Sequence, residues 1–135
     1  MNILKVLTDK RKKGNIGEAA VCKHLRRRGY KILERNYVAD NHEIDIIAKG
    51  HGHVCFVEVK TQSKNAANPY GLRPADAVDA KKRRSIIDAA KSYTSLVYDN
   101  SKFRFDVAEV FLDANRKVTE INYLEGAFSA DRDYR

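Results

Sequence analysis

Two of the most apolar stretches of this chain each carry an acidic residue near the centre. Asp45 lies within residues 44–47, which are otherwise isoleucine, and Glu58 lies within the apolar residues 54–59. Runs rich in β-branched residues form strands, and a carboxylate beside a core must be paired, hydrogen-bonded or bound to a cation. The sequence therefore predicts buried strands that carry acidic side chains to a site containing positive charge.

The order of the apolar patterns predicts an α/β fold. Helical spacing begins at Asn15 and ends at Gly29, and a second helical pattern runs from Pro74 to Leu96. Strand-forming segments occupy residues 30–38, 43–48, 53–61, 103–108 and 117–124, and residues 64–73 form a loop. We expect a mixed central β-sheet flanked by helices, in the order αβββαββ.

The length of 135 residues predicts a single domain over residues 14–128. Residues 1–13 are expected to form a basic N-terminal arm, either mobile or a frayed first helix, and residues 129–135 a C-terminal tail. Cys22 and Cys55 lie in apolar stretches, which predicts buried thiols in a reducing cytoplasm. No signal-peptide core or membrane-spanning run is visible, so we expect no membrane partner and a cytoplasmic location.

The charge of the chain is concentrated at one end. The 26 Lys and Arg against 18 Asp and Glu give a net charge of +8, and residues 1–37 hold eleven basic and three acidic side chains. A one-sided basic field favours polyanions, with nucleic acid first and an acidic membrane surface second. The candidate nucleic-acid contacts are Lys10, Arg11, Lys12, Lys13 and Arg27.

Three acids and one lysine carry the candidate chemistry. Glu18 heads the apolar face of the first helix, and Glu58 and Lys60 share one face of a strand. If the neighbouring strands form a hairpin, Asp45 comes near Glu58, and two close carboxylates suit a hard cation such as Mg²⁺. A lysine beside that ion can position a water. A metal ion held by carboxylates, together with a positioned water, is what metal-assisted phosphodiester hydrolysis requires.

Each feature also has a simpler interpretation. Asn15 and Glu18 match a helix N-cap with its reciprocal partner, and the Glu58–Lys60 pair matches a surface ion pair. Asp45 would then face solvent. The cations at residues 81–84 fill nearly a full helical turn and are expected to be mostly solvated, and Asp106 is expected to form a surface pair with its neighbour two residues earlier.

The motifs together resemble a known family. An acidic residue in the first helix, Asp45 on the second strand and Glu58-x-Lys60 on the third resemble, in order, the pattern of the PD-(D/E)XK nuclease superfamily. Residues 14–20, 29–37, 43–48 and 56–61 are similar in sequence to one branch of it, the YraN family, also called uncharacterised protein family 0102, which is related to archaeal Holliday-junction resolvases. The resemblance implies a restriction-endonuclease-like core.

The resemblance also implies roles for individual residues. Asp45, Glu58 and the Val59 carbonyl would bind Mg²⁺ or Mn²⁺, Glu18 would support the ion or its waters, and Lys60 would orient the attacking water. Glu43 and Gln62 would lie beside these ligands. His42 stands where the family usually has glycine, and Gln62 stands where it often has a basic residue.

The function implied is a Mg²⁺-dependent endonuclease that hydrolyses DNA, including branched forms, with a homodimer as the expected assembly because resolvase-like enzymes often work in pairs. The alternative is a noncatalytic nucleic-acid-binding module on the same fold. A third interpretation is a protein-interaction role in which the acids are structural. A shared fold does not decide among these three.

Overall fold

The computed structural model describes residues 2–63, 78–97 and 99–130. Its elements follow the expected order of one helix, three strands, one helix and two strands. They are α1 (Ile3–Arg27), β1 (Lys31–Ala39), β2 (His42–Gly50), β3 (His53–Ser63), α2 (Ala80–Leu96), β4 (Lys102–Leu112) and β5 (Val118–Phe128). The α/β class and the mixed sheet are confirmed.

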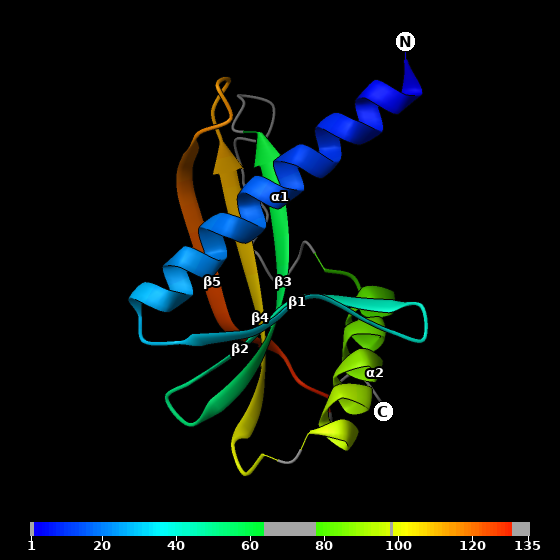
Figure 1. Ribbon diagram of the computed structural model, residues 1–135, viewed down its shortest axis with the longest axis vertical. Helices are drawn as coiled ribbons and strands as arrows, with labels where there is room; N and C mark the ends of the chain where they lie inside the picture. The colour runs from blue at the N-terminus through cyan, green and yellow to red at the C-terminus, as the bar shows by residue number, and fades with distance from the viewer. Residues whose placement is uncertain (1, 64–77, 98, 131–135) are drawn as a thin grey trace.

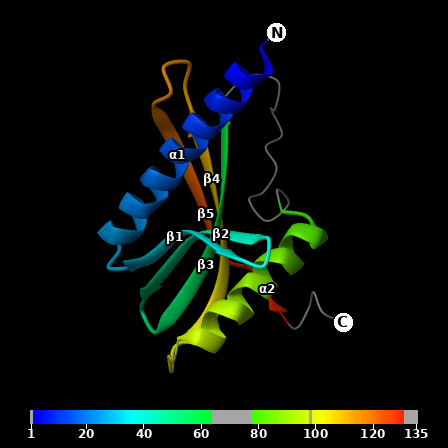
Figure 2. The same cartoon turned by 45° about the vertical axis from the view of Figure 1, so that its right-hand side comes forward.

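The five strands form one sheet in the order β1-β2-β3-β4-β5. Neighbours pair antiparallel except β3 and β4, which are parallel because the chain crosses over through α2 between them. Helix α1 runs diagonally across β3, β4 and β5, and α2 lies on the other side of the sheet beside β1 and β2 (Figures 1 and 2). A helix therefore covers each face.

Helix α1 begins twelve residues earlier than the sequence pattern indicates. It starts at Ile3, and the side chain of Asn2 caps it by accepting a hydrogen bond from the Lys5 backbone N–H. Residues 3–13, expected as an arm, are thus continuous with the helix, because lysine and arginine are good helix formers. Asn15 lies inside α1, so the N-cap interpretation of Glu18 is wrong.

Helix α2 begins at Ala80 with Asp79 as its N-cap, and the Asp79 side chain accepts a hydrogen bond from the Lys82 backbone N–H at 2.8 Å. Val78 precedes the helix instead of lying within it, yet it is buried. The expected start at Pro74, the loop at 64–73 and residues 131–135 of the expected tail lie outside the described residues.

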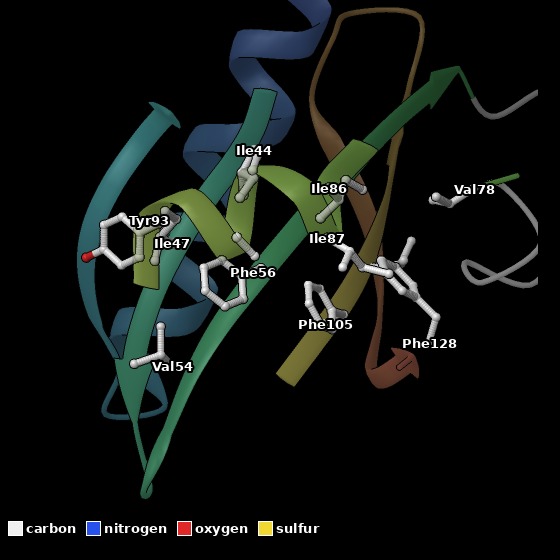
Figure 3. Packing of buried hydrophobic residues seen from close by; sticks show 13 residues of the cluster. Ile44, Ile47, Val54, Phe56, Val78, Ile86, Ile87, Tyr93, Phe105 and Phe128 are labelled. Atoms are coloured by element: carbon white, nitrogen blue, oxygen red, sulfur yellow. The ribbon is translucent and has the colours of Figure 1, made fainter. Parts of the chain in front are cut away.

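Two separate cores hold the helices against the sheet. Under α2, Phe56, Phe105 and Phe128 stack in succession, with ring centroids 5.5 and 5.1 Å apart (Figure 3). Under α1, both cysteines are buried as free thiols, as expected. Each fully buried Leu, Ile or Phe contributes about 1.5–3 kcal/mol, so both layers contribute substantially to the stability of the fold. Across the described ranges, neither helix is long and apolar enough to cross a membrane.

The expected surface pair of Arg104 and Asp106 is buried. Asp106 is fully buried and accepts hydrogen bonds from Arg104 at 2.8 and 3.0 Å, from the Tyr123 hydroxyl at 2.6 Å and from the Gly126 backbone N–H at 2.9 Å. Strand alternation places Asp106 on the α1 side of β4, where β5 and α1 exclude water. The surface interpretation is therefore wrong, and this network ties β4 to β5.

Candidate functional site

The candidate site forms where β2 separates from β3 while remaining paired with β1. Strand β2 pairs with β3 only as far as Ile46 and Val57, whereas β3 continues beside β4 to Ser63. Beyond that point the Asp45 carboxylate takes over from the missing backbone partner, since its Oδ2 accepts a hydrogen bond from the Val59 N–H at 2.8 Å. This bond holds Asp45 against the part of β3 that carries the next acid.

Asp45, which is half-buried, and Glu58, which is buried, form a carboxyl pair. Their side chains lie within hydrogen-bonding reach of each other. Burial, followed by repulsion from Asp45, raises the pKa of Glu58, and the nearby Lys82 and Lys60 partly oppose the shift. Glu58 is 4% exposed, and among the described residues its Oε2 has no hydrogen-bond partner. The site therefore contains a buried carboxyl oxygen that lacks a partner in the described chain.

Two lysines supply positive charge beside this pair. Lys60 Nζ lies 3.7 Å from Glu58 Oε1, as expected for side chains on one strand face, and Lys82 Nζ lies 3.9 Å from the same oxygen. The sequence analysis did not single out Lys82, because it belongs to the basic run at 81–84 that was expected to be solvated. The N-cap of α2 at Asp79 places the first helical turn next to Glu58.

Glu18 approaches the same place from α1, on the opposite face of the sheet from α2. It is 9% exposed, and its pKa is raised to about 7, first by burial and then by repulsion from Asp45. Arg35 lowers this pKa and Glu43 raises it further. The repulsion from Asp45 and Glu43 shows that these carboxyls lie near Glu18, and we call the three residues the acidic cluster.

A close approach of α1 to β3 positions Glu18. A Cβ atom at Gly17 would collide with the Thr61 Oγ1 atom, so only glycine fits where the helix meets the strand. Thr61 follows Lys60 directly in β3. Gly17 thus brings the helix backbone against the strand that carries Glu58 and Lys60, and Glu18 is the next residue along the helix.

Asn36 links the acids, and the sequence analysis did not assign it a role. It lies in β1 opposite Asp45, has a left-handed φ of 52°, and the hydrogen-bond network orients its amide nitrogen 2.8 Å from Glu18 Oε1 and 3.1 Å from Glu43 Oε1. Asparagine is depleted in strands and tolerates positive φ, so its position in a strand-forming run was the available signal. Strained backbone of this kind clusters at functional sites.

Glu109 is another buried acid that the sequence analysis did not single out. It pairs in register with Lys60 across β3 and β4, is fully buried, and neither carboxyl oxygen has a hydrogen-bond partner among the described residues. Burial, followed by repulsion from Glu120, raises its pKa. Glu109 therefore favours the protonated form.

The donor chemistry fits a hard divalent cation. In the described segments, no group of three or more His, Cys, Asp and Glu side chains is arranged to hold a metal ion. Mg²⁺, however, commonly uses only one or two protein carboxylates and completes its shell with water and substrate phosphate oxygens. Asp45 and Glu58 provide two adjacent carboxyls with one unpartnered buried oxygen. A cation bound there would stabilise the ionised form of both carboxyls, which burial disfavours.

The remaining predicted residues lie at the margins of this cluster. Gln62 is half-buried on β3, and His42 accepts or donates a hydrogen bond with Ser85 of α2 at 2.8 Å. Lys13 donates a hydrogen bond to Ser63 Oγ at 3.2 Å, near the end of β3. The other predicted nucleic-acid contacts are exposed along α1 and are not grouped with the acids; they are Lys10, Arg11, Lys12 and Arg27.

Comparison with known proteins agrees with the resemblance seen in the motifs. The family described as "Uncharacterised protein family UPF0102" matches residues 17–110. A UPF0102 protein of Clostridium acetobutylicum is 40% identical over 119 residues, covering 87% of this chain and 94% of the relative. One from Chlorobium chlorochromatii is 43% identical over 119 residues, covering 85% and 89%, and one from Chlorobium phaeobacteroides is 38% identical over 120 residues, covering 85% and 91%. The chain therefore belongs to the uncharacterised protein family UPF0102, the YraN family.

Proposed function

We propose that this protein is a Mg²⁺-dependent endonuclease that hydrolyses phosphodiester bonds of DNA. One observation carries the proposal: the carboxyls of Asp45 and Glu58 are paired in a buried site, with an unpartnered oxygen and with Lys60 close by. A buried acid pair of this kind reduces the stability of a metal-free protein, since each charge loses hydration. Such a cost is common at sites that bind cations.

The residues of the site divide the chemistry among them. A Mg²⁺ or Mn²⁺ ion bound by Asp45, Glu58 and the Val59 carbonyl would supply Lewis acidity and neutralise charge on the phosphate. Lys60, with its ammonium 3.7 Å from Glu58 Oε1, holds and orients a water for attack on phosphorus. Lys82 lies on the other side of Glu58 and attracts the phosphate. Glu18, with a pKa of about 7, can exchange a proton with a water at neutral pH.

Asn36 and Glu43 complete the arrangement without contacting the reacting atoms. The Asn36 amide lies between the Glu18 and Glu43 carboxyls, which prevents them from repelling each other out of position. Gln62 lies four residues after Glu58 on the same face of β3, within reach of a DNA backbone that enters beside Lys60. We assign Glu43 and Gln62 to positioning: Glu43 helps to hold the acidic side chains, and Gln62 helps to hold the DNA backbone.

Incubation of the purified protein with Mg²⁺ or Mn²⁺ and a panel of linear, forked and four-way DNA tests the activity. We expect cutting that Glu58→Ala and Lys60→Ala each abolish, while Lys102→Ala, an exposed lysine at the start of β4, leaves it intact. Cutting that survives Glu58→Ala and Lys60→Ala would refute the assignment. Comparison of the substrates tests whether branched forms are preferred.

The alternative function is a noncatalytic nucleic-acid-binding module. One observation supports it without a metal: α1 carries exposed cations, among them Lys10, Arg11 and Lys12. Titration calorimetry with Mg²⁺ and Mn²⁺ separates the two functions. Heat that disappears in Asp45→Asn and Glu58→Gln supports the nuclease, and DNA binding with no such heat supports the module.

We propose that the protein acts on DNA in the cytoplasm. We also propose that two copies of the chain act together to cut both strands. Sedimentation velocity with and without a four-way junction tests the pairing. Two protein copies on each junction would support it, and a single copy at saturating protein would exclude it.

A further inference from the structure

We propose that a groove between the C-terminal half of α1 and β5 binds the phosphate backbone of duplex DNA, at a place separate from the acidic cluster. The groove has a volume of about 670 Å³, and three cationic side chains line it: Lys23, Arg27 and Arg28. His24 lies between them. No acidic side chain is among its lining residues in the described chain. Three cations around a groove without a carboxylate form a binding site for anions.

The floor of the groove is apolar. The apolar lining residues of the groove, which we call the floor, are Val118 and Ile121 of β5 and Ala20 of α1, and we call the three cations the rim. A sugar–phosphate backbone has the matching chemistry, because its phosphate oxygens are charged and its deoxyribose rings are largely apolar. A free inorganic anion would use the rim and leave the floor exposed to water.

The cationic rim continues along the helix. Lys12 lies eleven residues before Lys23, which is close to three full turns, so both side chains project from the same flank of α1. Arg27 follows on that flank one turn later. The stretch from Lys12 to Arg27 covers about 22 Å at 1.5 Å per residue. That length spans about six base pairs of duplex at 3.4 Å each.

Neighbouring side chains hold the end of the groove in place before any ligand binds. Arg28 Nε donates a hydrogen bond to His24 Nε2 at 2.9 Å, and the His24 ring stacks on Tyr123 with centroids 5.4 Å apart. Burial, followed by the charge of Arg28, lowers the pKa of His24, so the imidazole stays a neutral acceptor. The Arg28 guanidinium is thereby oriented by an uncharged ring, and it forms no ion pair within residues 2–63, 78–97 and 99–130.

Two acids on neighbouring elements have ion-pair partners outside the groove. Asp9, on the same flank of α1, is paired with Arg116 of the β4–β5 turn at 3.2 Å. Glu125 of β5 lies 3.5 Å from Arg104 and also lines a neighbouring pocket with His24 and Arg28. Neither carboxylate lines the groove itself. Glu125 therefore offsets part of the charge of Arg28, and Lys23 and Arg27 carry the positive potential of the groove.

The groove and the acidic cluster lie on opposite sides of α1. Glu18 and Arg27 are nine residues apart, which is half a turn more than two full turns, so their side chains project in opposite directions. DNA bound at the groove is consequently a different segment from DNA at the acids. This last point rests on the proposed function, whereas binding at the groove does not.

Fluorescence anisotropy with a short labelled DNA duplex in EDTA tests the groove without any cleavage. The variant is Lys23→Ala/Arg27→Ala, and the control is Lys91→Ala/Lys102→Ala, which removes the same charge from α2 and the start of β4. Each phosphate contact contributes about 0.9 to the slope of log K against log salt. We expect the groove variant to bind at least about tenfold more weakly, with a slope smaller by about two, and the control to match the wild type within about twofold.

The charge-preserving variant Lys23→Arg/Arg27→Lys should keep both the affinity and the slope, and circular dichroism should show all variants folded. Equal loss in the groove variant and the control, or an unchanged slope in the groove variant, overturns the proposal. Binding of the wild type to anionic lipid vesicles but not to DNA overturns it as well. Because no metal is present, a protein that never cleaves DNA can still pass this test, so its failure and the failure of the proposed nuclease function are distinguishable.

Discussion

Replacing Glu18 by glutamine should raise the free energy of unfolding of the metal-free protein at neutral and higher pH. Burial and repulsion from Asp45 raise the Glu18 pKa from 4.5 to about 7. The folded protein therefore binds a proton at this site more tightly than the unfolded chain does. The resulting stabilisation is fully present below the unfolded pKa and is lost as the pH rises through the folded pKa.

The size of the effect follows from the two pKa values. Each pH unit between them is worth about 1.4 kcal/mol, so the wild type carries a penalty of about 3 kcal/mol near pH 8 and of about 0.8 kcal/mol near pH 5. Glutamine has nearly the same shape as glutamate and no charge. It keeps the hydrogen-bonding position opposite Asn36 and should remove most of the penalty.

Urea unfolding in EDTA at both pH values measures the difference. Glu34→Gln is the matched control, since it removes an exposed carboxylate of β1 and should change the stability by less than about 0.5 kcal/mol. We expect Glu18→Gln to gain stability over the wild type as the pH rises. A variant that is no more stable than the wild type at the higher pH would refute the reasoning, because it would mean that the Glu18 carboxylate is already compensated in the folded protein.

Three further outcomes test the rest of the site. Gly17→Ala should lower the unfolding free energy by about 1–3 kcal/mol because its methyl group meets Thr61, whereas Gly14→Ala, in open space on the same helix, should raise it by up to about 1 kcal/mol; equal effects would contradict the close approach. Asn36→Ala should be less stable than Asn36→Gly by about 1 kcal/mol because of the left-handed backbone, and chemical denaturation of both variants measures this. Mg²⁺ at about one hundred times its dissociation constant should stabilise the wild type by about 2.7 kcal/mol in thermal unfolding, and Glu58→Gln should lose that shift.

The arrangement of elements could be predicted from the sequence because it depends on local patterns. Strand-forming residues bounded by turn signals located the strands, and helical spacing located the buried face of α1. The start of α1 was not predicted because residues 3–13 do not pack against the core. Ile3, Leu4 and Leu7 are exposed, so the segment has no apolar face at helical spacing that would mark it as helical. High helix propensity alone extends the helix there.

The burial of the two acids in β4, Asp106 and Glu109, could not be predicted. Asp106 and Glu109 alternate with apolar residues in β4, which is also the pattern of a half-exposed strand. Both are fully buried because β4 has a strand on each side and a helix layer over each face. A strand's own sequence does not contain its position in the sheet, so a central strand and an edge strand with the same alternation are indistinguishable at that stage.

The convergence of the acids depends on a feature that no single segment encodes. Alternation predicts that Glu58 and Lys60 share a face, and the helical pattern places Glu18 on the face of α1 that packs against the sheet. Those two faces are on opposite sides of a continuous sheet, and a continuous sheet would keep the side chains apart. Glu18 and Glu58 nevertheless both interact with Asp45, because β2 stops pairing with β3 at Ile46 and the sheet is open beside β3 at that point. The length of a strand pairing is a tertiary property, set here by the Val59 N–H donating to Asp45 in place of a backbone carbonyl and by Asn36 in left-handed conformation on β1. A substitution that restored regular β2–β3 pairing would therefore separate Glu18 from Glu58 while leaving every residue of the site in place.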